Sequence, residues 1–149
     1  MDDSSREKRP VSLSAIMVSG IIALASSIFL LVYDKNLMNH AMLHWYGLIA
    51  YVIIIVILLG LSAGRSKGAF VGLIIIPVVF IVLILADAAL NLPLSSFHST
   101  SPSMLGWRYL FGFGAAGEGS TAIRSSALVI DLVASAVLIG ASVRALMKK

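Results

Sequence analysis

The chain has 149 residues, of which 59% are hydrophobic and 12% are charged, and its formal net charge is +4. Typical soluble domains are about 25% charged, so this composition excludes an ordinary water-soluble domain and indicates a membrane protein. The chain contains no cysteine. Disulfides, iron–sulfur clusters and thiolate metal sites within this chain are therefore excluded.

Four long apolar runs, separated by three polar breaks, follow a polar tail at residues 1–10. About 20 helical residues span the hydrocarbon core of a bilayer, and none of the runs shows the strict alternation of barrel strands. We therefore expect a disordered cytoplasmic tail and, over residues 11–149, a single all-α transmembrane domain. The expected fold is a bundle of four transmembrane helices. Their predicted ranges are 11–33, 37–63, 69–92 and 122–146.

The distribution of basic residues predicts the orientation. Eight of the eleven Lys and Arg residues fall in the N-terminal tail, the second connection or the C-terminal tail. Cytoplasmic segments of membrane proteins are enriched in these residues, so both termini are predicted to be cytoplasmic in a multi-pass protein of the cell membrane. The same distribution accounts for the positive charge without a nucleic-acid partner.

Small residues suggest how the helices pack. Gly20, Ala23 and Ser27 are spaced by three and four residues in the first run, and such a stripe lets another helix approach closely. Glycine also recurs every fourth residue from Gly60 to Gly72. Two interpretations stay open for these glycines: they serve helix packing, or two of them form a tight turn between antiparallel helices.

His40 and His44 predict an outer-face metal site. Residues four apart share one face of a helix, so both imidazoles could bind one copper or zinc ion. The alternative is that both side chains lie at the membrane interface and bond to water or loop carbonyls. A third ligand would be needed, and the candidates are His98, Asp87, Asp34 and Glu118.

Asp87 and Asp131 are predicted to lie inside the membrane, each in the outer half of its helix. Intramembrane carboxylates usually face the bundle interior or a watery cavity. If these two meet, they could share a proton or hold a cation. The alternative is structural: Arg124, seven residues before Asp131, pairs with it. The inner halves of the four helices contain no ionisable side chain, which favours a site on one side of the membrane.

The predicted outer loop of about 29 residues between the third and fourth helices is rich in aromatic residues. Trp107 and Tyr109 lie in it, and Trp45 lies at the predicted outer end of the second helix. Such residues favour the headgroup region. We therefore expect them to form an aromatic surface on the outer face.

Three functions fit these patterns. The first is an accessory subunit, without catalytic activity of its own, of a larger membrane complex such as a respiratory or metal-dependent oxidase or monooxygenase assembly. It would dock on other subunits through its helix faces and outer loop. The second is an outer-face copper- or zinc-binding protein that uses His40 and His44. The third is a homo-oligomeric carrier coupled to protons or cations through Asp87 and Asp131. All three share the bilayer as a partner.

Overall fold

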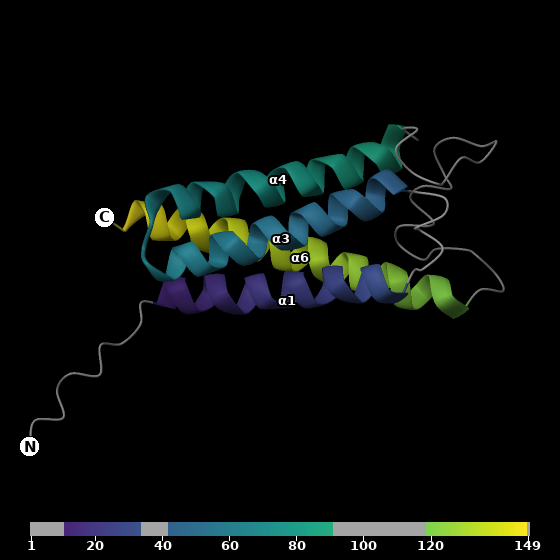
Figure 1. Ribbon diagram of the computed structural model, residues 1–149, viewed down its shortest axis with the longest axis horizontal. Coiled ribbons are helices and arrows are strands. Elements are labelled where there is room, and N and C mark those ends of the chain that lie inside the picture. The colour runs from purple at the N-terminus through teal and green to yellow at the C-terminus, as the bar shows by residue number, and fades with distance from the viewer. Residues whose placement is uncertain (1–10, 34–41, 91–118, 149) are drawn as a thin grey trace, which may run out of the picture.

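The computed structural model describes residues 11–33, 42–90 and 119–148, and these residues form four long helices (Figure 1). Each helix contains a span of 18 to 22 residues that is long and apolar enough to cross a membrane. The prediction of four helices that can span a membrane is therefore confirmed. Such helices are typical of a multi-pass membrane protein. The helices are α1 (Val11–Tyr33), α3 (Met42–Ala63), α4 (Lys67–Leu90) and α6 (Gly119–Met147).

The helices lie side by side in one bundle (Figure 1). The start of α1, the turn between α3 and α4, and the end of α6 gather at one end of the bundle, which we call the terminal end. The opposite end is called the far end. Helix α1 contacts α3 and α6, and α4 contacts the same two helices, so that α3 and α6 lie diagonally across the bundle. The most extensive of these contacts joins α1 to α6.

A tight turn at residues 64–66 joins α3 to α4. The backbone N–H of Arg65 donates to the Ser62 carbonyl at 2.9 Å, and the Ala69 N–H donates to Ser66 Oγ at 3.5 Å. Ser66 thus caps the start of α4, as serine commonly does. Arg65 occupies the left-handed backbone region with φ of 57°, which few residues other than glycine adopt readily. The two helices are antiparallel neighbours, as the sequence predicts.

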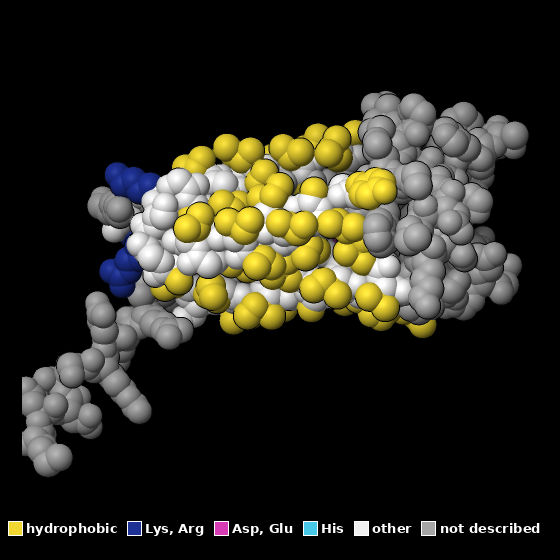
Figure 2. Space-filling model, in the orientation of Figure 1, with side chains coloured by type: hydrophobic (Ala, Val, Ile, Leu, Met, Phe, Trp, Pro, Cys, Tyr) yellow, Lys and Arg dark blue, Asp and Glu magenta, His cyan; other side chains and the backbone are white. Residues whose placement is uncertain are grey.

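The outer surface of the bundle is apolar along its length. Large exposed hydrophobic side chains lie on all four helices, and examples are Val18, Ile57, Val82 and Val133. Figure 2 shows such side chains along the described face of the bundle, with Lys and Arg gathered at the terminal end. Monomeric soluble proteins rarely expose large apolar side chains over a surface that extends along every helix. A surface of this kind suits contact with lipid.

Glycines allow close contact between helices at two places. A Cβ added to Gly20 would lie 2.6 Å from Leu59 Cδ2, and one added to Gly72 would lie 2.7 Å from Leu58 Cδ2. A Cβ at Gly60, by contrast, would meet nothing within 4 Å. The small-residue stripe of α1 is thus a packing face, as predicted. The repeated glycines beyond α1 serve different purposes, because Gly72 packs against α3 while Gly60 is exposed.

The apolar core lies mainly between the centre of the bundle and the terminal end. Leucines from three helices meet there: Leu59 on α3, Leu73 on α4 and Leu138 on α6. Ile16 of α1 and Ile55 of α3 belong to the same buried cluster. The buried polar side chains of Ser27 and Asp131 lie nearer the far end.

Leucine at position 20 should separate α1 from α3. We expect Gly20→Leu to lower the free energy of unfolding by about 1–3 kcal/mol, the usual cost of overpacking. The matched variant Gly60→Leu should be neutral or gain up to about 1 kcal/mol from helix propensity. Both values can be measured by titrating folded protein in mild-detergent micelles with dodecyl sulfate and following circular dichroism. Equal losses in the two variants would contradict the assigned packing face.

Candidate functional site

Asp131 is the most unusual residue of the bundle, because its side chain is a carboxyl group with no solvent exposure. It lies on α6 and faces α1. The Oγ of Ser27, which is also fully buried, donates a hydrogen bond to Asp131 Oδ2 at 2.5 Å. This bond joins the two helices that share the most extensive contact, at the end of the small-residue stripe on α1.

The second carboxyl oxygen of Asp131 continues the hydrogen bonding toward α3. Ser135, one turn later on α6, donates from Oγ to Asp131 Oδ1 at 3.4 Å. Ser135 Oγ also lies 2.8 Å from the hydroxyl oxygen of Tyr51 on α3. Because Ser135 donates to Asp131, Tyr51 donates to Ser135. We call these four residues, Ser27, Tyr51, Asp131 and Ser135, the Asp131 network.

The fourth helix joins the network through an aromatic contact. The ring of Tyr51 stacks on Phe80 of α4 with centroids 4.1 Å apart and an interplanar angle of 17°. This stack fixes the direction of the Tyr51 ring and so places its hydroxyl group at Ser135. All four helices therefore meet at one level of the bundle.

The Asp131 network lies in the far half of the bundle. Ser27, Tyr51 and Asp131 are each five residues from the far end of the apolar span that contains them. At a rise of 1.5 Å per residue this corresponds to a depth of about 8 Å. Asp131 thus lies inside the apolar span of α6 and not at the edge of that span.

The described basic side chains lie far from Asp131. The described basic residues Arg65, Lys67, Arg144 and Lys148 lie at the terminal end. Arg144 is thirteen residues beyond Asp131 on α6, or about 20 Å along the helix. The side chain of Arg124 lies outside the described residues, so the predicted ion pair between Arg124 and Asp131 stays a prediction.

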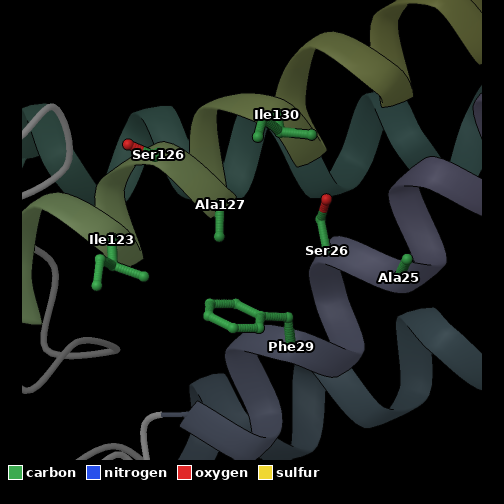
Figure 3. A pocket seen from close by; sticks show the side chains of 7 residues that line it. All are labelled: Ala25, Ser26, Phe29, Ile123, Ser126, Ala127 and Ile130. Carbon is green, nitrogen blue, oxygen red and sulfur yellow. The ribbon is translucent and has the colours of Figure 1, made fainter.

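A shallow groove of about 520 Å³ lies between α1 and α6 near the network (Figure 3). The ring of Phe29 points across it toward Ala127, which lies one turn before Asp131 on α6. Most of its lining is apolar, and Ser26 and Ser126 are the polar residues among those that line it. The residues that line it are Ala25, Ser26, Phe29, Ile123, Ser126, Ala127 and Ile130.

Most of the other predicted site residues lie outside the described part of the chain. The helices include the backbone of His44, Trp45 and Asp87, but their side chains are not described. Within the described ranges, no group of three His, Asp or Glu side chains is placed to hold a metal ion. The metal site, the aromatic outer surface and the meeting of Asp87 with Asp131 therefore stay predictions. The predicted residues that lie wholly outside the described ranges are Asp34, His40, His98, Trp107, Tyr109 and Glu118.

Sequence reasoning identified Asp131 but missed the hydroxyl groups around it. The spacing of small residues predicts a packing role for Ser27, whereas its hydroxyl group contacts the carboxyl group of Asp131. Ser135 follows Asp131 by four residues, a spacing that places both on one helix face, and this signal was available in the sequence. Tyr51 lies within a continuous apolar run over residues 48–59, and nothing in that run marks its hydroxyl group as part of a site.

No protein family, curated protein or solved structure matches this chain. The chemistry of the site follows from its residues. A carboxyl group can hold or release a proton, and each hydroxyl group can donate one hydrogen bond while it accepts others. The Asp131 network is therefore one carboxyl group that can bind a proton, hydrogen bonded to a chain of hydroxyl groups inside the bundle.

The bond between Ser27 and Asp131 should be measurable as a coupling between α1 and α6. In a double-mutant cycle, Ser27→Ala and Asp131→Ala should show a coupling energy of about 0.6–1.7 kcal/mol, from the average to the maximum for hydrogen bonds between membrane helices. Unfolding in dodecyl sulfate supplies the four free energies.

Ser19 provides the matched control. Its Oγ donates to the Ala15 carbonyl of its own helix at 2.7 Å, so a cycle of Ser19→Ala with Asp131→Ala should be additive within about 0.3–0.5 kcal/mol. Additivity in the Ser27 cycle as well would show that the contact with Asp131 contributes nothing to stability.

Proposed function

We propose that this protein is a proton-binding membrane carrier in which Asp131 takes up and releases the transported proton. One observation carries this proposal: Asp131 is fully buried in the membrane-spanning bundle and bonds to the hydroxyl groups of Ser27 and Ser135. Ionisable residues inside the membrane are expensive, and they commonly mark ion and proton pathways. The carrier is proposed to act as a homo-oligomer.

The geometry favours a proton over a metal ion at this carboxyl group. Ser27 Oγ contacts Asp131 Oδ2 directly at 2.5 Å, so a cation would have to break this bond to reach both oxygens. Hard cations also prefer six or more oxygen ligands, whereas the network offers two carboxyl oxygens and three hydroxyl groups. A proton neutralises the carboxylate without any rearrangement. It also removes the cost of a buried charge, about 2.5–3.5 kcal/mol at a helix centre on insertion scales.

The terminal end of the bundle is proposed to face the cytoplasm, in the cell membrane. Support comes from Arg65, Lys67, Arg144 and Lys148, which lie at that end, because cytoplasmic segments are enriched in such residues. Asp131 would then lie closer to the outer face. Protons from the outside would reach it over a shorter distance than protons from the cytoplasm.

A second candidate is the predicted accessory subunit of a larger membrane complex. Gly60 on α3 and Gly140 on α6 are both exposed, and a Cβ added to either would meet nothing within 4 Å. Small residues on a helix surface permit close docking of another helix, and here they are available to a partner. In such a complex Asp131 would supply a proton-exchanging group. The predicted copper or zinc site remains a third proposal.

Replacement of Asp131 by asparagine should abolish proton transport while leaving the bundle folded. Asparagine has nearly the same shape and can still accept a hydrogen bond from Ser27, but it carries no exchangeable acidic proton. Purified protein in liposomes that contain a pH-sensitive dye should acidify the interior under an applied membrane potential. The Asp131→Asn protein should match protein-free liposomes.

Two variants control this experiment. Asp131→Glu keeps the acid and should retain measurable flux. Ser62→Ala removes a buried hydroxyl group that donates only to the Leu59 carbonyl of its own helix, so it should behave as the unmodified protein. Flux that is the same in the unmodified and Asp131→Asn proteins would end the proposal of a proton carrier. Co-purification of other chains in stoichiometric amounts would instead support the second candidate.

A further inference from the structure

Ser142 on α6 has a buried hydroxyl group that the fold leaves without a partner. The residue has no solvent exposure, and its Oγ makes no hydrogen bond to any described group. Other buried serines differ. Ser19 and Ser62 each donate to a carbonyl of their own helix at 2.7 Å, and Ser27 and Ser135 donate to Asp131.

A serine inside a helix normally has an easy solution, because its hydroxyl group can donate to the carbonyl four residues earlier. For Ser142 this carbonyl belongs to Leu138, and that bond is not made. A buried polar group without a partner is destabilising and is commonly satisfied by an ordered water molecule. The orientation of Ser142 therefore points to a ligand that can hydrogen bond.

The position of Ser142 relates it to the Asp131 network. Ser142 lies seven residues after Ser135, which is close to two full turns, so both lie on the same face of α6 at a separation of about 10 Å. It lies six residues before Lys148, or about 9 Å from the terminal end. The hydroxyl group is thus between the water at that end and the buried carboxyl group.

Two buried serines on α1 lie close to the level of Ser142 along the bundle. Ser27 contacts Asp131, and α1 and α6 run in opposite directions (Figure 1). Ser142, eleven residues after Asp131, is therefore level with about residue 16 of α1. The fully buried Ile16 occupies this level, and the buried serines Ser12 and Ser19 lie about one turn to either side of it.

An apolar layer separates Ser142 from the Asp131 network. Leu138 lies between Ser135 and Ser142 on the same face, and it belongs to the same buried cluster as Leu59 and Leu73. Water that reaches Ser142 from the terminal end would therefore stop at these leucines.

We propose that Ser142 binds water that enters from the terminal end, so that a hydrated site reaches to within two helix turns of Ser135. The role of this water as a source or acceptor of the Asp131 proton rests on the proposed function. The presence of the water does not, because it follows from the buried hydroxyl group alone.

The absence of cysteine from the chain allows a direct test by single-cysteine labelling. Ser142→Cys, Leu138→Cys and Lys148→Cys proteins would be treated in sealed membrane vesicles with a small, charged methanethiosulfonate that cannot cross the bilayer. Such reagents attack a thiolate in contact with water. The Lys148→Cys protein identifies the side of the vesicle on which the terminal end lies.

The Ser142→Cys protein should react from the same side as Lys148→Cys and at least about tenfold faster than Leu138→Cys, because thiolate formation requires water. A rate no greater than that of Leu138→Cys would overturn the hydrated site. Loss of labelling together with intact Asp131-dependent flux would remove the water site alone. Labelling without such flux would remove the proposed function and keep the water site.

Ser142→Ala supplies a second measurement that does not depend on labelling. If the hydroxyl group is dry and unpaired, its removal relieves a cost, and the protein should become more resistant to dodecyl sulfate or stay unchanged. If the hydroxyl group holds a bound water, its removal leaves that water with one partner fewer, and resistance should fall. A fall supports the proposal, whereas a gain or no change contradicts it.

Discussion

The hydrogen bond from Ser27 to the buried carboxyl group of Asp131 is the interaction on which the rest of the bundle depends. It fixes the register of α1 against α6, the pair with the most extensive contact. From Asp131 the hydrogen bonds pass through Ser135 to Tyr51, and the Tyr51 ring stacks on Phe80. One carboxyl group thus sets the relative positions of all four helices.

A polar centre of this kind helps helices to associate in a membrane. Lipid tails are as apolar as leucine side chains, so burial of leucine gives little drive for helices to associate in lipid. Association must come from close packing and from hydrogen bonds between helices. Gly20 and Gly72 provide the first by admitting Leu59 and Leu58 to within van der Waals contact, and the Asp131 network provides the second. The same carboxyl group that directs packing can also exchange a proton, so structure and proposed function share one residue.

The sequence predicted the parts of this structure that depend on composition and local spacing. Four apolar runs of membrane length, the tight turn around Arg65 and the packing stripe through Gly20 and Ser27 follow from residue types along a single helix. The partners of Asp131 did not follow, because pairing between Ser27 and Asp131 depends on how α1 and α6 are aligned in space. Residues 104 positions apart carry no local signal of contact. The unpaired hydroxyl group of Ser142 cannot be predicted for the same reason, because the sequence does not show which group a serine on a helix bonds to.

The central claim is that Asp131 holds a proton that it can exchange inside the membrane, and infrared difference spectroscopy tests it most directly. Spectra of the reconstituted protein before and after a pH step would show whether a protonated carboxyl C=O stretching band appears or disappears. The account predicts such a band in the unmodified protein, its shift in deuterated water and its absence from Asp131→Asn. An identical difference spectrum in both proteins would contradict the account. Asp131 would then form structural hydrogen bonds without exchanging a proton.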